Sequence, residues 1–277
     1  MDNVTRSLFV AFLLAIGVSG IRAEEAPAVR DYDRFDLRVG GGWVFGANTT
    51  VSYIGQTGAG ALIDYDKTLD GDTSNSLFRV DGTWNINQRH SLNYTWYDVN
   101  RTGLRTLDHE IEFGDKTFPV GASIDSQLDI KLNRLLYRYG LARTDTVNFD
   151  IGGGIYYANI SMTMTAAGNV GAAGAGTTDS LSVKAPLPTA GINVVCKLSP
   201  RWSTTFAADW FYFAYNGWQG AETDIQIGLA YQIAKNWTLG AAYDRFTIDL
   251  EGPINHTSTF KVDNVWNSLY SYLSFHW

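Results

Sequence analysis

Apolar and polar residues alternate with a period of two along most of this chain, as they do in half-buried β-strands. In the first such segment Phe35, Leu37 and Val39 share one face, opposite Asp36 and Arg38. The same alternation predicts strands over 35–54, 76–86, 90–100, 128–141, 147–162, 184–198, 202–215, 223–233, 237–250 and 264–277. The chain is therefore predicted to be all-β and antiparallel, with about ten strands and eight as the alternative.

The lengths of the predicted connections indicate which kind of β protein this is. A soluble sandwich or lipocalin-like barrel turns its apolar face inward, whereas a membrane barrel turns it outward, and alternation alone fits both. The connections 87–89, 142–146, 199–201 and 234–236 are short, 216–222 is intermediate, and 55–75, 101–127, 163–183 and 251–263 are long. Short and long connections therefore alternate. Short periplasmic turns and long extracellular loops are typical of a transmembrane up-and-down β-barrel.

Aromatic residues recur at the positions where such a barrel would meet the two membrane surfaces. Trp202 and Trp237 follow short turns directly, and Tyr139 and Tyr231 precede them. A second set lies some six to ten positions further along the strands, or about 15–25 Å at the rise of tilted strands. The aromatic girdle is predicted to comprise Trp84, Trp96, Tyr139, Trp202, Trp210, Tyr231, Trp237, Tyr243, Phe275 and Trp277.

The end of the chain resembles the C-terminal strand of bacterial outer-membrane barrels, in which an aromatic residue closes an alternating segment. Here that residue is Trp277, with Phe275 and Leu273 on the same face. The turn at Lys235-Asn236-Trp237 also looks like those of small outer-membrane barrels. The chain is similar in kind to the eight-stranded OmpA/OmpX/OmpW-like groups and to the ten-stranded omptin-like group. The resemblance implies one barrel domain over 35–277 and contact of the last strand with the outer-membrane assembly machinery.

The beginning of the chain has the features of a secretory signal peptide. Leu8–Val18 is an apolar run that is too short to span a bilayer as a helix. A signal peptide over 1–23 is predicted, with cleavage after Ala23 or alternatively after Gly20, followed by a periplasmic segment over 24–34. The expected location is the outer membrane of a Gram-negative bacterium.

Composition narrows the range of partners. The formal net charge is −7, which disfavours nucleic acid because phosphate contacts require Lys and Arg. Cys196 is the single cysteine, so no intrachain disulfide can form. The expected partners are outer-membrane lipid and lipopolysaccharide, and a monomer is expected.

One predicted strand changes phase. Leu128, Ile130 and Leu132 lie on one face of segment 128–141, whereas Leu135 and Tyr137 lie on the other. Either a β-bulge or a change of environment beyond the membrane could cause the shift near Asn133. The second explanation is favoured, and it places Arg134 and Arg138 in the lumen with Leu135, Tyr137 and Tyr139 on lipid.

The predicted lumen is charged, and two functions are compatible with it. Its lining charges are expected to be Arg38, Arg79, Asp81, Arg134, Arg138, Asp150, Asp209, Asp224 and Asp244. If they pair with one another, they fill the barrel, and its role is structural or a surface interaction. If they line open water, the barrel is a narrow porin-like channel for ions or small solutes.

An omptin-like hydrolase is a remote alternative. Only Asp108, His109, Asp70 and Asp72 could supply the Asp–His pair and the carboxylate pair of such an enzyme. Adjacent residues on a strand point to opposite faces, so Asp108 and His109 are expected to make a poor dyad. No catalytic, cofactor-binding or metal-binding residue is assigned, no cofactor is expected, and the chain is predicted not to be an enzyme.

Overall fold

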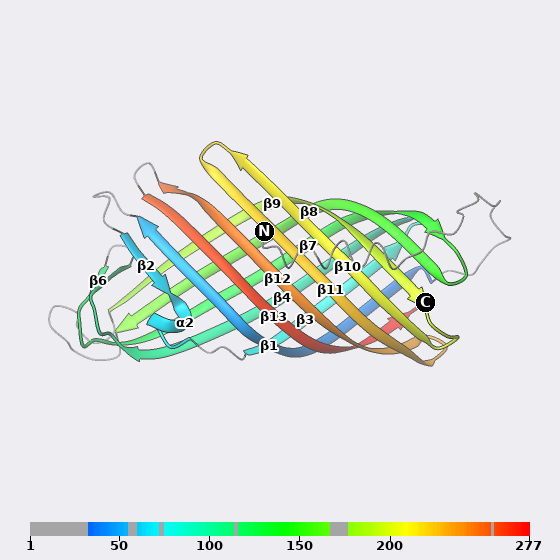
Figure 1. The fold of residues 1–277 in the computed structure, drawn as a ribbon, viewed down its shortest axis with the longest axis horizontal. Helices are drawn as coiled ribbons and strands as arrows, with labels where there is room; N and C mark the ends of the chain where they lie inside the picture. The colour runs from blue at the N-terminus through cyan, green and yellow to red at the C-terminus, as the bar shows by residue number, and fades with distance from the viewer. Residues whose placement is uncertain (1–32, 55–59, 72–74, 114–115, 167–176, 256–257) are drawn as a thin grey trace. The chain divides into compact units, whose positions relative to one another are not determined.

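Ten long antiparallel strands pair in sequence order and close into a ring (Figure 1). They are β1 (Phe35–Ile54), β3 (Asn75–Asn85), β4 (His90–Thr106), β7 (Ser123–Arg143), β8 (Val147–Ala166), β9 (Thr178–Lys197), β10 (Trp202–Tyr215), β11 (Trp218–Ala234), β12 (Trp237–Asn255) and β13 (Ser258–His276). The ring closes where β13 pairs with β1, from Asp36 opposite His276 to Ile54 opposite Thr259. The prediction of an antiparallel barrel of about ten strands is confirmed.

This computed structural model describes residues 33–54, 60–71, 75–113, 116–166, 177–255 and 258–277. The predicted signal peptide over 1–23 and residues 24–32 of the predicted periplasmic segment lie outside the described residues. No helix within these ranges is long and apolar enough to cross a membrane.

One end of the barrel carries the short turns and the other the longer connections. The short-turn end comprises the turns at 86–89, 144–146, 198–201 and 235–236, and both Phe35 and Trp277 lie there. The opposite, long-loop end carries β2 (Gly60–Asp64), the short helix α2 (Tyr65–Thr68), and a small hairpin formed by β5 (Ile111–Phe113) and β6 (Lys116–Phe118). The alternation of connections read from the sequence thus sorts them to two ends.

The strands at the long-loop end are longer than the sequence pattern predicted. The expected connection 216–222 is wrong: Asn216 and Gly217 alone make a two-residue turn, and β11 begins at Trp218. Both turn residues have positive φ, 52° and 81°, as the hairpin turns that match strand twist require. The expected loops 101–127, 163–183 and 251–263 are likewise shortened by strands that continue into them.

The sequence pattern did not predict these extensions, because the polarity of the inward and outward faces is exchanged along the length of the barrel. Toward the short-turn end the outward side chains are apolar and the inward ones polar. Toward the long-loop end the order is reversed. On β12 the outward series passes from Tyr243 to the exposed Arg245, while the inward series passes from Asp244 to the buried Phe246 and Ile248. A membrane-facing wall therefore continues into one with an apolar interior and a polar exterior, as in a water-soluble protein.

Strand β7 shows that this change needs no irregularity of the backbone. Its pairing with β4 is continuous from Tyr139 opposite His90 to Ser123 opposite Thr106. Arg134 and Leu132 both face inward and are buried, whereas Leu135 faces outward and is 52% exposed. The phase shift near Asn133 is thus a change of environment along a regular strand, with no bulge between β4 and β7.

A real irregularity lies on β1. Its register with β13 shifts between Phe45 and Asn48, and Gly46 within the shift has φ 59°. The bulge keeps the inward face continuous, because Val44 precedes it and Ala47 follows it on the buried side. A residue with a side chain at position 46 would be strained in this conformation.

Candidate functional site

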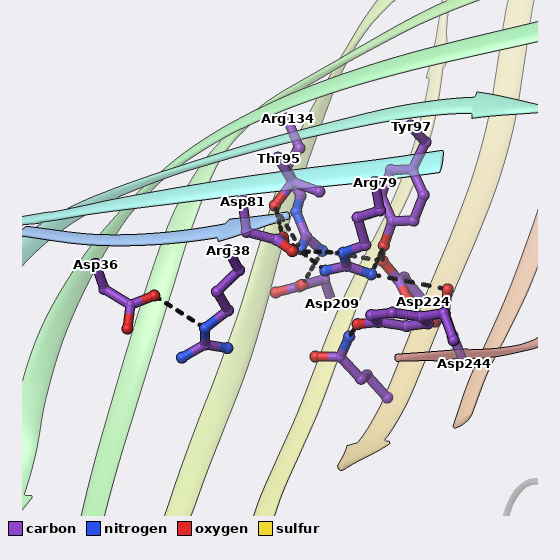
Figure 2. Close-up of polar contacts among 12 residues, drawn as sticks. Asp36, Arg38, Arg79, Asp81, Thr95, Tyr97, Arg134, Asp209, Asp224 and Asp244 are labelled. Atoms are coloured by element: carbon purple, nitrogen blue, oxygen red, sulfur yellow. Dashed lines mark hydrogen bonds and ion pairs between the residues drawn. The ribbon is translucent and has the colours of Figure 1, made fainter. Parts of the chain in front are cut away.

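The most elaborate polar arrangement is inside the barrel, about midway along the strands (Figure 2). We call it the charged layer. It contains Arg79, Asp81, Arg134, Arg138, Asp209, Asp224 and Asp244, with Thr95 and Tyr97 between them. Each lies on an inward-facing position of β3, β4, β7, β10, β11 or β12, and the period of two brings them to one level.

Arg79 anchors one side of the charged layer. Its Nε and Nη2 each donate to Asp81 at 2.8 Å, in a bidentate geometry that fixes the guanidinium plane. Its Nη1 donates to the hydroxyl of Tyr97 and lies 3.9 Å from Asp244 Oδ2. The guanidinium also lies over the rings of Tyr97 and Tyr270, at 4.4 and 5.1 Å from their centroids. Arg79 is therefore held by four different strands.

Arg134 crosses the lumen from the other side. Its Nη1 donates to Asp209 and, at 3.0 Å, to Asp224 Oδ2, and its Nη2 donates to Thr95 Oγ1 at 3.2 Å. Thr95 donates in turn to Asp81 Oδ1 at 2.8 Å, and Tyr97 to Asp224 at 3.3 Å. These bonds close a circuit through β3, β4, β7 and β11. These buried charges pair with one another and not with water. The paired side chains occupy the cross-section of the lumen at this level.

The remaining predicted lining charges lie apart from the charged layer. Arg38 pairs with Asp36 at 2.9 Å near the short-turn end, and Figure 2 shows this pair to one side of the layer. Asp150 pairs with Arg143 and accepts from Asn193 at 3.1 Å. Within the layer, Arg138 has its Nη2 3.5 Å from Asp209 Oδ1.

Sequence reasoning missed one buried acid. Glu222 faces inward on β11, two residues from Asp224, and is 2% exposed. It was assigned to a connection because the alternation was read only from residue 223. Its position in phase with Asp224 and Gln226 is the signal that could have revealed it. Within the described part of the chain, neither carboxylate oxygen of Glu222 has a hydrogen-bond partner, and the same holds for Asp244.

Between the charged layer and the long-loop end, most inward-facing side chains are apolar. Trp266 stacks on Phe246 with centroids 4.5 Å apart, and both are 1% exposed or less. The segment from β2 through α2 adds Ile63, Tyr65 and Leu69, all buried. The sequence predicted a polar and charged lumen, and the structure adds a mainly apolar core toward the long-loop end, where Arg101 and Asn264 are buried as well.

The predicted aromatic girdle follows the outer wall. Trp277 stacks on Phe35 and Phe275, with both centroid distances 5.2 Å, and Trp237 contacts Phe275 at 4.8 Å. Trp202 contacts Tyr231 at 4.9 Å, and Trp84 stacks on Phe35 at 6.4 Å. The rings nearest the short-turn end are therefore in mutual contact across strands. At the other level Tyr243 donates to Asn267 at 2.7 Å, where the outer face becomes polar.

The remaining predicted aromatics lie on the same outer face. Trp210 is 44% exposed on β10, Trp96 on β4 packs edge-on against Phe78 at 5.7 Å, and the hydroxyl of Tyr139 accepts from Arg89 at 3.2 Å.

The expected geometry of Asp108 and His109 is wrong. The two residues lie in a bend after β4, outside any strand, and Asp108 Oδ1 is 2.5 Å from His109 Nδ1. This hydrogen bond from His109 lowers the pKa of Asp108. Both side chains are well exposed, at 72% and 59%. Asp70 is exposed, and Asp72 lies outside the described residues.

No group of three or more His, Cys, Asp or Glu side chains in the described ranges could hold a metal ion.

No protein-family model and no curated protein matches the sequence. Among solved structures, the chain is similar to the outer membrane protease OmpT from Escherichia coli, with a TM-score of 0.55 and 9% sequence identity over 88% of this chain and 96% of that one. It is also similar to the translocator domain of the autotransporter NalP from Neisseria meningitidis, with a TM-score of 0.42 and 10% identity over 99% and 95% of the two chains. A third similarity is to Ail of Yersinia pestis, with a TM-score of 0.31 and 10% identity over 86% and 97%.

The protein thus has the fold of the small outer-membrane β-barrel proteins. At 9% sequence identity, the similarity to OmpT shows the fold and assigns no activity.

Proposed function

We propose that this chain is an integral protein of the bacterial outer membrane with a closed lumen, and that its role is structural or a surface interaction. The observation that carries the proposal is the filled interior. The circuit formed by Arg79, Asp81, Thr95, Arg134, Asp224 and Tyr97 crosses the lumen, and a packed apolar core lies above it. An ion would have to break the circuit and then pass a mainly apolar core, in which Arg101 and Asn264 are also buried.

Conductance in planar lipid bilayers tests the closed lumen directly. We expect the purified full-length protein to give no reproducible current steps, under conditions in which a general porin gives them. Reproducible steps would instead favour the alternative of a narrow channel for ions or small solutes. Insertion is checked in the same preparation by gel mobility, because a folded barrel migrates differently before and after boiling.

The proposed location rests on the outer wall and on the predicted signal peptide. Apolar side chains face outward on every strand at the short-turn half, flanked by aromatic rings. We expect export with cleavage after Ala23. The new N-terminus would then be in the periplasm, and the short-turn end, where β1 begins, would face the same side. N-terminal sequencing of the protein recovered from outer membranes tests this, and a mature chain that begins elsewhere would contradict the assigned cleavage site.

The proposed partners follow from the same wall. The outward band would contact outer-membrane lipid and lipopolysaccharide, and the last strand would contact the assembly machinery during insertion. Trp277 contributes its ring to the aromatic contacts at the end of β13. We expect Trp277→Ser to reduce the amount of folded protein in the outer membrane, with Ser271→Ala on the outward face of the same strand as the control. A monomer is expected in detergent by light scattering.

A hydrolase is the second candidate, and the Asp108–His109 hydrogen bond is the observation that favours it. It resembles half of a water-activating site, at the same end of the barrel as the long loops. Both side chains are largely in solvent, where such a pair gains little from a shielded environment. We expect no peptide hydrolysis by the protein. Hydrolysis that is lost in His109→Ala would favour the second candidate.

A further inference from the structure

Strands β9 and β10 stop pairing with each other, although both continue toward the long-loop end. Their ladder runs from Lys197 opposite Ser203 to Ala190 opposite Trp210, and there it stops. Beyond that point β9 remains paired with β8 as far as Thr178, and β10 remains paired with β11 as far as Tyr215. Figure 1 shows the β10–β11 hairpin, in yellow, projecting away from the neighbouring strands. We call this interruption of the wall the β9–β10 break.

Two prolines explain where the ladder ends. Lys197 of β9 donates to Thr146, which precedes β8, whereas Leu198 donates to Trp202 of β10. Since successive residues of a strand direct their backbone groups to opposite sides, the even-numbered residues of β9 face β10. Pro186 and Pro188 are the even-numbered residues that come after the last pair. Neither has an amide hydrogen, so the ladder loses two consecutive donors at the break.

The break lies where the outer wall changes from apolar to polar. On β9 the outward series runs from Ala190 through Pro188 and Pro186 to the exposed Lys184. On β10, Trp210 and Tyr212 face outward and are 44% and 75% exposed. A membrane-spanning barrel would therefore present the break to the lipid at the upper edge of its apolar band.

Behind the break several inward side chains are apolar, and the hydroxyl of Thr189 on β9 donates to the Trp210 carbonyl of β10 at 3.5 Å. Leu187 on β9 and Phe211 on β10 are 0% and 7% exposed, and Phe213 packs against Phe211 with centroids 6.1 Å apart. An alkyl chain that passed between the two strands would meet these side chains rather than the charged layer, where Asp209 is one inward position further down.

Two buried polar groups without partners flank the same place. Glu222 is paired across the ladder with Phe211, and Tyr156 with Leu187, so one lies on each side of the break. Among the described residues, neither carboxylate oxygen of Glu222 has a hydrogen-bond partner, nor does the hydroxyl of Tyr156, although the two residues are 2% and 0% exposed. Leaving buried polar groups unpaired is unfavourable, and a ligand with complementary groups would remove that cost.

We propose that the β9–β10 break admits a single-chain amphiphile from the membrane, and that Glu222 binds a hydrogen-bond-donating amine at the head of that molecule. The alkyl chain would lie against Leu187, Phe211 and Phe213 and leave the barrel between Pro188 and Tyr212. The hydroxyl of Tyr156 would accept a further hydrogen from the amine. The proposal goes beyond a structural or surface role, and it does not require that the lumen conduct.

Photo-labelling tests the proposal in the intact protein. The full-length chain in phosphatidylcholine vesicles is exposed to a photoreactive dodecylamine, and the labelled peptides are identified by mass spectrometry. We expect saturable labelling of β9 and β10 on both sides of the break, competed by unlabelled dodecylamine. A photoreactive dodecanoate, which is anionic and donates no hydrogen bond at neutral pH, should label the same peptides far less. Labelling spread evenly along the outward band and not competed would show ordinary lipid contact and overturn the proposal.

Variants separate recognition by Glu222 from entry through the break. Glu222→Gln should weaken saturable labelling by the amine about tenfold or more, since it removes a charge-assisted hydrogen bond. Asp263→Asn, at an exposed outward position of β13, is the matched control and should have no effect. Pro186→Val with Pro188→Val restores both amide donors, extends the ladder and should reduce labelling even with Glu222 intact. If Glu222→Gln fails to fold by gel mobility, this double variant decides the question. Labelling that is unchanged in the folded variants would overturn the proposal.

Discussion

The carboxylate of Asp66 pairs with the guanidinium of Arg101, a side chain of β4 that is wholly buried. The same carboxylate accepts from the backbone amide of Thr49 on β1 at 2.8 Å. Strand β3 normally separates β1 from β4, but it begins only at Asn75, opposite Val44 of β1. Beyond it, Asp66 links the two strands and holds α2 against the barrel. At the long-loop end, the side chain of Asp66 thus helps to join β1 and β4, where β3 no longer lies between them.

Asp66→Ala should therefore destabilise the protein strongly. It removes the carboxylate that pairs with the buried Arg101, whose guanidinium also donates to Thr49 Oγ1 at 2.7 Å, and breaking a buried pair typically costs about 3–5 kcal/mol. Lys67→Ala, next in sequence, breaks an exposed pair with Asp64 and should change the stability far less. Urea unfolding in lipid vesicles, followed by tryptophan fluorescence, measures both. Equal losses in the two variants would contradict the role given to Asp66.

Arg134→Met should likewise be costly, because it leaves Asp209 and Asp224 in the charged layer without the cation that bridges them. About 3–5 kcal/mol is expected. Arg245→Met on the outward face is a matched control, since that guanidinium is exposed and donates to Asn267 at 3.1 Å. Its loss should not exceed about 1 kcal/mol. A small effect at Arg134 would mean that water or other side chains compensate for its absence.

Gly191→Ala should disturb the charged layer, because the added methyl group would displace the side chain of Asp209. A Cβ at this position would lie 1.8 Å from Asp209 Oδ1, so the carboxylate would have to move away from Arg134. We expect a loss of about 1–3 kcal/mol. Gly82→Ala is the control, because a Cβ there meets nothing within 4 Å. That change should be neutral or slightly stabilising, since alanine loses less backbone entropy on folding.

The Asp108–His109 hydrogen bond predicts a local dependence on pH. His109 lowers the pKa of Asp108 below its ordinary value of 3.8. A carboxyl group whose pKa is lower in the folded state stabilises that state above the unfolded pKa, and the contribution is lost as pH falls through the folded pKa. In His109→Ala the pKa of Asp108 should rise toward 3.8, as measured by an NMR titration of the side-chain carboxyl. An unchanged titration would show that the hydrogen bond does not form in solution.

The sequence by itself determined the fold class and most of the barrel wall. The period of two, the alternating lengths of the connections and the aromatic positions such as Trp237 and Trp277 all follow from a sheet with one face in lipid. They hold for each strand separately, so they can be read without knowing what lies across the barrel. The prediction assumed an outward face that is apolar along the whole strand. Beyond the apolar band the outward face is polar and the inward face apolar, so the predicted ends of strands such as β4 and β11 came too early.

Only the tertiary structure decided what the interior does. Which of the inward charges meet depends on strand register and on barrel closure, which bring Arg134 of β7 to Asp224 of β11 across the lumen. The pairing of Asp66 with Arg101, the isolation of Glu222 and the end of the β9–β10 ladder are likewise contacts between distant segments. Period two fixes which face a side chain takes, whereas its partner is set by the level at which other strands present theirs.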